Sequence, residues 1–133
     1  MIDSIPARFL ETGRRRGNGP AYFVNAGGDA WKATSWATFS EEVRGAAKSL
    51  IAMGLQPGQS VCILGFNRPE WVIVDIGAML AGGAPAGIYT TCSPEEVEYI
   101  VDHSEARVVL VENHGQWQKI NERREHLPKL ERV

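Results

Sequence analysis

The hydrophobic pattern in the middle of the chain predicts a buried strand followed by a buried helix. Residues 61–64 (VCIL) are all apolar, which is typical of a strand covered on both faces. The sequence NRPE at 67–70 predicts a helix start, because Asn67 is a good cap for free backbone N–H groups. The helix that follows, residues 71–80, is apolar on nearly every side apart from Asp75, so we expect it to be buried.

Small residues then turn the chain back into a second buried strand. Glycine and proline at 82–85 end the helix. Residues 86–89 (AGIY) resume an extended pattern with side chains too small for an ordinary surface strand. A helix and a strand buried this deeply are expected in the interior of a fold larger than themselves.

After the amino-terminal third of the chain, predicted helices and strands alternate. Capping-box sequences open two of the helices, TFSE at 38–41 and SPEE at 93–96. The apolar run at 108–111 (VVLV) predicts another covered strand, a helix follows around 115–125, and a last strand starts near Leu130. This order predicts an α/β fold with a mainly parallel sheet, flanking helices and right-handed crossovers.

The first residues predict a helix and a hairpin outside that alternation. Residues 3–16 have a helical pattern, and residues 21–25 and 31–36 flank the turn sequence AGGD, which tolerates positive φ. We therefore assign residues 1–133 to a single partial domain, in which an amino-terminal helix and β-hairpin precede the sheet. The last strand is expected to continue beyond the given sequence.

Composition and charge narrow the class of partner. The chain is 44% hydrophobic and carries a net charge of −2, which does not favour binding to nucleic acid or attraction to an anionic membrane. Its longest apolar run is too short to span a bilayer, and its amino terminus lacks the charge order of a signal peptide. Cys62 and Cys92 are isolated, which indicates no disulfide framework and favours a cytoplasmic protein.

No residue pattern in the sequence matches a nucleotide loop or a metal site. The glycines fit neither G-x-G-x-x-G nor the P-loop sequence. The histidines, His103, His114 and His126, lack metal-ligand spacing, and Asp75 is interpreted as a residue at the edge of a buried face. We therefore assign no catalytic residue and no metal ligand.

The turn at residues 89–92 (YTTC) is the best candidate site. It follows the carboxyl end of a predicted parallel strand and precedes a helix amino terminus, where open α/β sheets bind ligands. Hydroxyl and backbone N–H groups of Tyr89, Thr90 and Thr91 offer hydrogen bonds to a phosphate or to a pantetheine amide. A plain strand-to-helix connection is the alternative interpretation.

Three ordered segments resemble the amino-terminal part of the AMP-forming acyl-CoA synthetases (the adenylate-forming ligase superfamily), and most closely the long-chain fatty-acid–CoA ligase group. They are SWATFSEEVRGAAKSLIAMGLQPGQSVCIL, then NRPEWVIVDIGAMLAGGAPAGIYTTCSPEEVEYIVDHSEARVVLVE, and LPKLERV. Gln59 departs from the acidic residue usual after the Pro-Gly turn. The resemblance implies a parent enzyme of fatty acid metabolism that uses ATP, Mg²⁺ and coenzyme A. The fatty acid carboxylate attacks the α-phosphate of ATP, and the coenzyme A thiol then displaces AMP.

The resemblance also implies roles for particular residues. In related enzymes, the segment that matches Tyr89, Thr90 and Thr91 lies along the coenzyme A channel, and positions near Lys119 approach the nucleotide phosphates of coenzyme A. The family's motifs for the triphosphate and the ribose do not occur in this sequence and are expected beyond Val133. Residues 1–133 alone are therefore expected to make no adenylate and to bind no cofactor tightly.

Two other functions stay open. One is a stand-alone α/β binding or interaction module derived from such a ligase, and the other is an adenylating enzyme that loads a carrier-protein thiol. A piece of a larger sheet exposes an apolar edge, so self-association is expected. Because a fatty acid substrate dissolves in membranes, peripheral membrane contact is also expected of a cytoplasmic parent enzyme. No nucleic-acid partner is expected.

Overall fold

The computed structural model of the chain describes residues 3–133. The elements follow one another as α1 (Ile5–Arg16), β1 (Pro20–Gly27), β2 (Ala30–Ser35), α2 (Trp36–Ala52), β3 (Ser60–Leu64), α3 (Pro69–Leu80), β4 (Ala84–Ile88), α4 (Pro94–His103), β5 (Val108–Val111), α5 (His114–Asn121) and the 3₁₀ helix η1 (Arg124–His126). Helices and strands alternate from α2 onward, as the sequence predicts.

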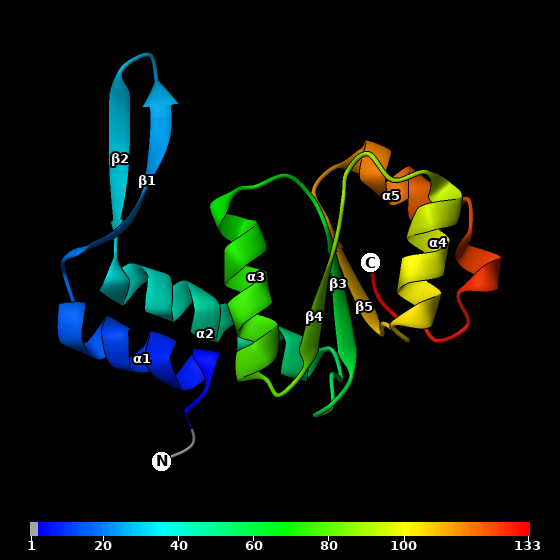
Figure 1. Cartoon of the computed structure of the whole chain (residues 1–133), viewed down its shortest axis with the longest axis horizontal. Coiled ribbons are helices and arrows are strands. Elements are labelled where there is room, and N and C mark those ends of the chain that lie inside the picture. The colour runs from blue at the N-terminus through cyan, green and yellow to red at the C-terminus, as the bar shows by residue number, and fades with distance from the viewer. Residues whose placement is uncertain (1–2) are drawn as a thin grey trace.

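The fold has three layers, in which a parallel sheet lies between two layers of helices (Figure 1). Helices α2 and α3 cover one face of the sheet, with α1 packed against α2, and α4 and α5 cover the other face. The antiparallel hairpin β1–β2 projects away from these layers. The predicted α/β class, with its amino-terminal helix and hairpin, is confirmed.

The sheet has the strand order β4–β3–β5, and both pairings are parallel. Successive residues of the central strand β3 point to opposite faces, as the pleat requires. Cys62 and Leu64 pack with residues of α4 and α5, whereas Val61 packs with residues of α2 and α3. All of residues 61–64 are buried, which confirms the strand predicted from their continuous apolar run.

The predicted start of α2 is wrong, whereas that of α4 is confirmed. Helix α4 begins with a complete capping box, in which Ser93 and Glu96 cap each other's backbone N–H groups. Helix α2 begins three residues earlier than the sequence TFSE predicts, because the Ser35 side chain accepts the hydrogen bond from the N–H of Thr38. The N–H of Trp36 also donates to the carbonyl of Gly19, a contact with the α1–β1 loop.

The start of α3 also differs from its prediction. Arg68, and not Asn67, is the N-cap residue, and no side chain there accepts a hydrogen bond from the first turn. The Arg68 guanidinium instead forms ion pairs with Glu70 and Glu112. The helix is also less buried than expected, since Gly77 and Ala78 are buried but Val72 is exposed.

Close contact between α2 and α3 depends on a glycine. A Cβ atom at Gly77 would lie 2.8 Å from the Cβ of Ala46 and 3.2 Å from the carbonyl oxygen of Val43. Such distances are shorter than normal carbon–carbon and carbon–oxygen contacts, so the two helix backbones can approach this closely only because residue 77 has no side chain. This contact sets how closely α3 lies against α2.

The carboxyl-terminal residues only begin the predicted last strand. Arg132 forms an isolated parallel bridge with Val108, and its carbonyl accepts a hydrogen bond from the N–H of Val109. The helix predicted around 115–125 is divided into α5 and η1. Within residues 3–133, no helix combines the length and the apolar character needed to cross a bilayer.

Candidate functional site

Three loops meet at the carboxyl edge of the sheet, which is the edge where β3, β4 and β5 end. They are residues 65–68 after β3, residues 89–93 after β4, and residues 112–113 after β5. The three strands are parallel neighbours, so their carboxyl ends lie at one edge. The sequence-predicted turn is one of these loops.

The turn at residues 89–92 is held by backbone and side-chain hydrogen bonds. The N–H of Cys92 donates to the carbonyl of Tyr89 at 3.1 Å, which closes the turn directly before α4. The Tyr89 side chain points into solvent and is 83% exposed, and Thr91 is also exposed. The turn therefore presents a phenol and a hydroxyl group at the molecular surface.

The structure brings Lys119 to this turn from α5. Its ammonium group donates hydrogen bonds of 2.7 Å to the carbonyl oxygens of Thr90 and Cys92. The neighbouring Gln116 donates from Nε2 to the same Thr90 carbonyl at 3.4 Å. All four residues predicted as site residues, Tyr89, Thr90, Thr91 and Lys119, are thus in one place, and Lys119 contacts the backbone of the turn.

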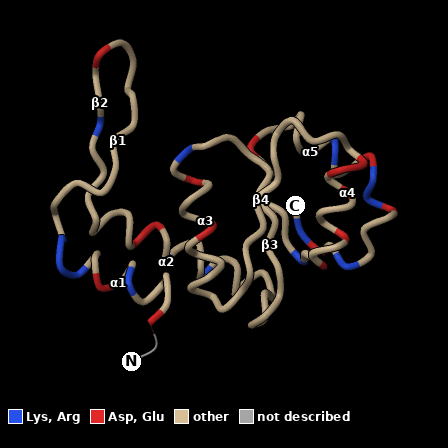
Figure 2. The backbone as a smooth tube through the Cα atoms, viewed as in Figure 1, with Lys and Arg blue, Asp and Glu red and all other residues tan. Residues whose placement is uncertain are grey.

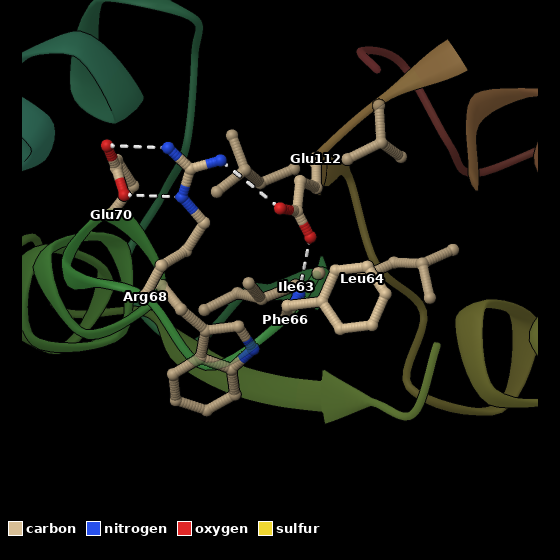
Figure 3. Close-up of a pocket in the computed structure, with 10 residues that line it drawn as sticks. Ile63, Leu64, Phe66, Arg68, Glu70 and Glu112 are labelled. Atoms are coloured by element: carbon tan, nitrogen blue, oxygen red, sulfur yellow. Dashed lines mark hydrogen bonds and ion pairs between the residues drawn. The ribbon is translucent and has the colours of Figure 1, made fainter. Parts of the chain in front are cut away.

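An ion-pair network connects the β3 and β5 loops (Figure 3). Glu112 is only 15% exposed, and it accepts a hydrogen bond of 2.6 Å from the N–H of Phe66 and one of 3.2 Å from Arg68. The Arg68 guanidinium donates its remaining bonds to Glu70. These charged groups border a cavity of about 280 Å³ whose other walls include Leu64 and Leu110.

A second cavity lies between the β3 loop and the 89–92 turn. Its volume is about 350 Å³, and its lining includes Asn67, Gly87, Tyr89 and Thr90. The Trp71 ring lines both cavities and lies against Gly87, where an added Cβ would approach the Cζ2 atom of the ring to 2.7 Å. Gly87 therefore leaves room for the ring that lines both cavities.

Local electrostatics shift a few pKa values around these loops. The hydrogen bond to Glu70 and then that to Glu112 raise the pKa of the exposed Arg68 guanidinium. The pKa of Glu70 is lowered, first by its own backbone N–H and then by Arg68. Partial burial on α3 raises the pKa of Asp75, and burial raises the pKa of the Cys62 thiol.

No nucleophile paired with a base is assigned at this edge, and the groups that face it are suited to binding. Hydroxyl groups, backbone amides and apolar walls match an elongated ligand that carries both polar and apolar parts. No group of three or more His, Cys, Asp or Glu side chains within residues 3–133 is arranged to hold a metal ion.

Sequence reasoning missed Arg68, Glu112, Trp71 and Gly87 as parts of this edge. A signal for two of them was present, because Arg68 and Glu112 follow the ends of two apolar strands, as Tyr89 follows a third. The partner of each could not be identified locally, since Arg68 and Glu112 are 44 positions apart in the chain.

The AMP-binding enzyme family matches the chain over residues 9–133. The long-chain-fatty-acid–CoA ligase ACSBG2 of Xenopus laevis is 42% identical over 130 residues, which are 98% of this chain and 18% of that protein. The human protein of the same name is 44% identical over 117 residues, which are 88% of this chain and 17% of that protein. This chain thus spans less than a fifth of the length of these curated relatives.

Solved structures of ligases contain the same fold. A crystal structure of the anthranilate CoA ligase AuaEII in complex with anthranoyl-AMP matches with a TM-score of 0.84 and 27% identity, over 96% of this chain and 24% of that one. The amino-terminal domain of FACL13 from Mycobacterium tuberculosis matches with a TM-score of 0.87 over 98% of this chain and 33% of that one. Its sequence identity is 20%, so this second match concerns the fold alone.

Proposed function

Because the chain belongs to the AMP-binding enzyme family, we propose that it forms the amino-terminal part of an AMP-forming long-chain fatty-acid–CoA ligase. The observation that carries this proposal is the 42–44% identity to ligases of that name, over 88–98% of this chain. The reaction would join a fatty acid to coenzyme A through an acyl-adenylate. In that ligase, this chain would contribute the ligand contacts at the carboxyl edge of its sheet.

We assign coenzyme A contact to the 89–92 turn, with Tyr89, Thr90 and Thr91 facing the ligand. The turn's exposed hydroxyl groups and the adjoining 350 Å³ cavity support this assignment. Lys119 has two of its three N–H donors in hydrogen bonds to the turn, and this leaves one donor for a phosphate.

ATP and Mg²⁺ would serve the adenylation step, in which ATP activates the fatty acid carboxylate. No residue of the described chain is assigned to either of them. The dense set of hydrogen-bond donors and positive charges that a triphosphate needs is not assembled at the carboxyl edge within residues 3–133. The Arg68 guanidinium, which lies at this edge, is already paired with two carboxylates.

The proposal has two competitors. A binding or interaction module derived from such a ligase would keep the fold but lose coenzyme A contact at the turn. An adenylating enzyme that loads a carrier protein would accept a pantetheine thiol attached to protein. The sequence identity to long-chain-fatty-acid–CoA ligases supports a ligase that uses free coenzyme A as its thiol substrate, in preference to both alternatives.

The isolated 133-residue chain is expected to show no ATP–pyrophosphate exchange with a long-chain fatty acid and no measurable ATP affinity. The reason is that residues 3–133, the part that the structure describes, are assigned no triphosphate site. Isothermal titration with ATP and an exchange assay with labelled pyrophosphate measure this directly. Tight ATP binding by the chain would contradict the proposal that none of its residues form the ATP site.

We further propose that the isolated chain self-associates. Figure 2 shows few charged residues on the hairpin, whereas Lys, Arg, Asp and Glu gather on α1 and on the α4–α5 side. Phe23 and Trp31 on the hairpin and Val72 on α3 are exposed apolar side chains. Sedimentation velocity is expected to give a sedimentation coefficient that rises with concentration, and a strictly monomeric chain would contradict this.

For the whole ligase we propose a cytoplasmic location with peripheral membrane contact. A long-chain fatty acid partitions into bilayers, so an enzyme that uses it gains by working at the membrane surface. No surface of this chain is assigned to that contact.

A further inference from the structure

Lys119 is bound by backbone carbonyls, which is an unusual environment for a lysine. Its ammonium group donates 2.7 Å hydrogen bonds to the carbonyl oxygens of Thr90 and Cys92. The side chain is partly buried, and no carboxylate within residues 3–133 forms an ion pair with it. Hydrogen bonds from a charged donor are shorter and stronger than those between neutral groups.

The two contacts join segments that are far apart in the sequence. Lys119 lies on α5, whereas Thr90 and Cys92 belong to the turn between β4 and α4. Because one ammonium group binds carbonyls on both sides of residue 91, it fixes the direction of both peptide groups. The Thr91 side chain between them stays exposed.

Gln116 supports the same turn from one helical turn earlier. It is 8% exposed, and its Nε2 atom donates to the carbonyl of Thr90 at 3.4 Å. Its own position is set by Asn113, whose side chain accepts the hydrogen bond from the N–H of Gln116. Helix α5 thus places two donors on the Thr90 carbonyl.

We propose that Lys119 is a positioning residue, which fixes the 89–92 turn through the Thr90 and Cys92 carbonyls and so sets the direction of Tyr89, Thr90 and Thr91. In this role it acts on the ligand through the turn, and its third N–H donor stays available for a phosphate. The consequence for coenzyme A rests on the proposed function, whereas the effect on the turn itself does not.

The two cysteines of the chain provide a test of this role that needs no ligand. Cys92 lies in the turn and is partly buried, whereas Cys62 is fully buried in the central strand. If Lys119 fixes the turn, its removal should expose the Cys92 thiol and leave the Cys62 thiol covered. Alkylation by iodoacetamide, followed by mass spectrometry of each cysteine peptide, measures both rates in one sample.

Lys119→Met is expected to raise the alkylation rate of Cys92 about tenfold, since two hydrogen bonds to a charged donor are lost. Lys119→Arg keeps charged N–H donors and is expected to restore most of the protection. Lys48→Met, on the exposed side of α2, is the control and should change neither rate.

An unchanged Cys92 rate in Lys119→Met would overturn the proposal. A parallel rise at Cys62 would also overturn it, because the lysine would then stabilise the whole fold and not the turn. Since no coenzyme A is present, the result is independent of whether the proposed ligase function holds.

Discussion

Replacement of Gly77 by valine is expected to destabilise the chain by about 3 kcal/mol, the upper part of the range for overpacking a core. A Cβ at this position would already approach the Cβ of Ala46 to 2.8 Å and the N atom of Ala47 to 3.2 Å. Valine adds two methyl groups to that contact, so α3 must move away from α2. Because small domains are stable by only about 5–15 kcal/mol, a loss of this size removes a large fraction of the total.

Gly45→Ala is the matched control for this prediction. Gly45 also lies in a helix, but an added Cβ there would meet no atom within 4 Å. Alanine favours helix over glycine by about 1 kcal/mol, so this variant should be more stable than the wild type. Urea denaturation followed by circular dichroism measures both changes. Equal effects of the two substitutions would contradict the close helix contact described here.

The second large effect is expected for Glu112→Ala, which should cost about 2 kcal/mol, the range for hydrogen bonds to a charged group. The carboxylate accepts bonds from the N–H of Phe66 and from Arg68, and its side chain is 15% exposed. Removing it leaves the Phe66 N–H and one Arg68 donor without this acceptor, and it removes the side-chain hydrogen bonds between the β3 loop and the β5 loop.

Glu70→Ala is the control that distinguishes the hydrogen bonds of the half-buried Glu112 from an ion pair at the surface. Glu70 pairs with the same guanidinium, but its side chain is 59% exposed. Exposed ion pairs contribute little, so this variant is expected to keep nearly wild-type stability. Glu112→Gln, which retains an acceptor for the Phe66 N–H, should fall between the two alanine variants. A loss for Glu70→Ala as large as that for Glu112→Ala would show that burial of Glu112 is not decisive.

Much of the architecture is predictable because it follows from local patterns. The apolar run of β3 and the capping box of α4 are both correct, since burial on two faces and reciprocal capping each leave a signature within a few residues. The hairpin follows from its glycine-containing turn. The family resemblance, which rests on an ordered set of such segments, is confirmed by the match over residues 9–133.

The wrong helix starts depend on contacts that no local window contains. Ser35 and Thr38 are equivalent caps in sequence, and Ser35 is used because the next N–H groups of α2 bind carbonyls of the α1–β1 loop. The N-cap of α3 is Arg68 in place of Asn67, and the Arg68 side chain bonds Glu112, a partner 44 positions away that no local pattern identifies.

The candidate site also has parts that the sequence predicts and parts that only the structure shows. The position of the 89–92 turn at a strand end follows from the alternation of elements, so the sequence alone locates the turn that carries Tyr89, Thr90 and Thr91. The resemblance indicated Lys119, but its contact with the Thr90 and Cys92 carbonyls required the structure. Contact of these residues with coenzyme A stays a prediction.

We propose above that the 89–92 turn contacts coenzyme A, and we expect the isolated chain to show no measurable ATP affinity. A titration of the ¹⁵N-labelled chain with coenzyme A, read residue by residue by NMR, tests it most directly. We expect weak binding, with a Kd of about 1 mM, and chemical-shift changes confined to residues 89–93 and α5. ATP at the same concentration should leave the turn unshifted. No response of the turn to coenzyme A, or an equal response to ATP, would contradict the claim.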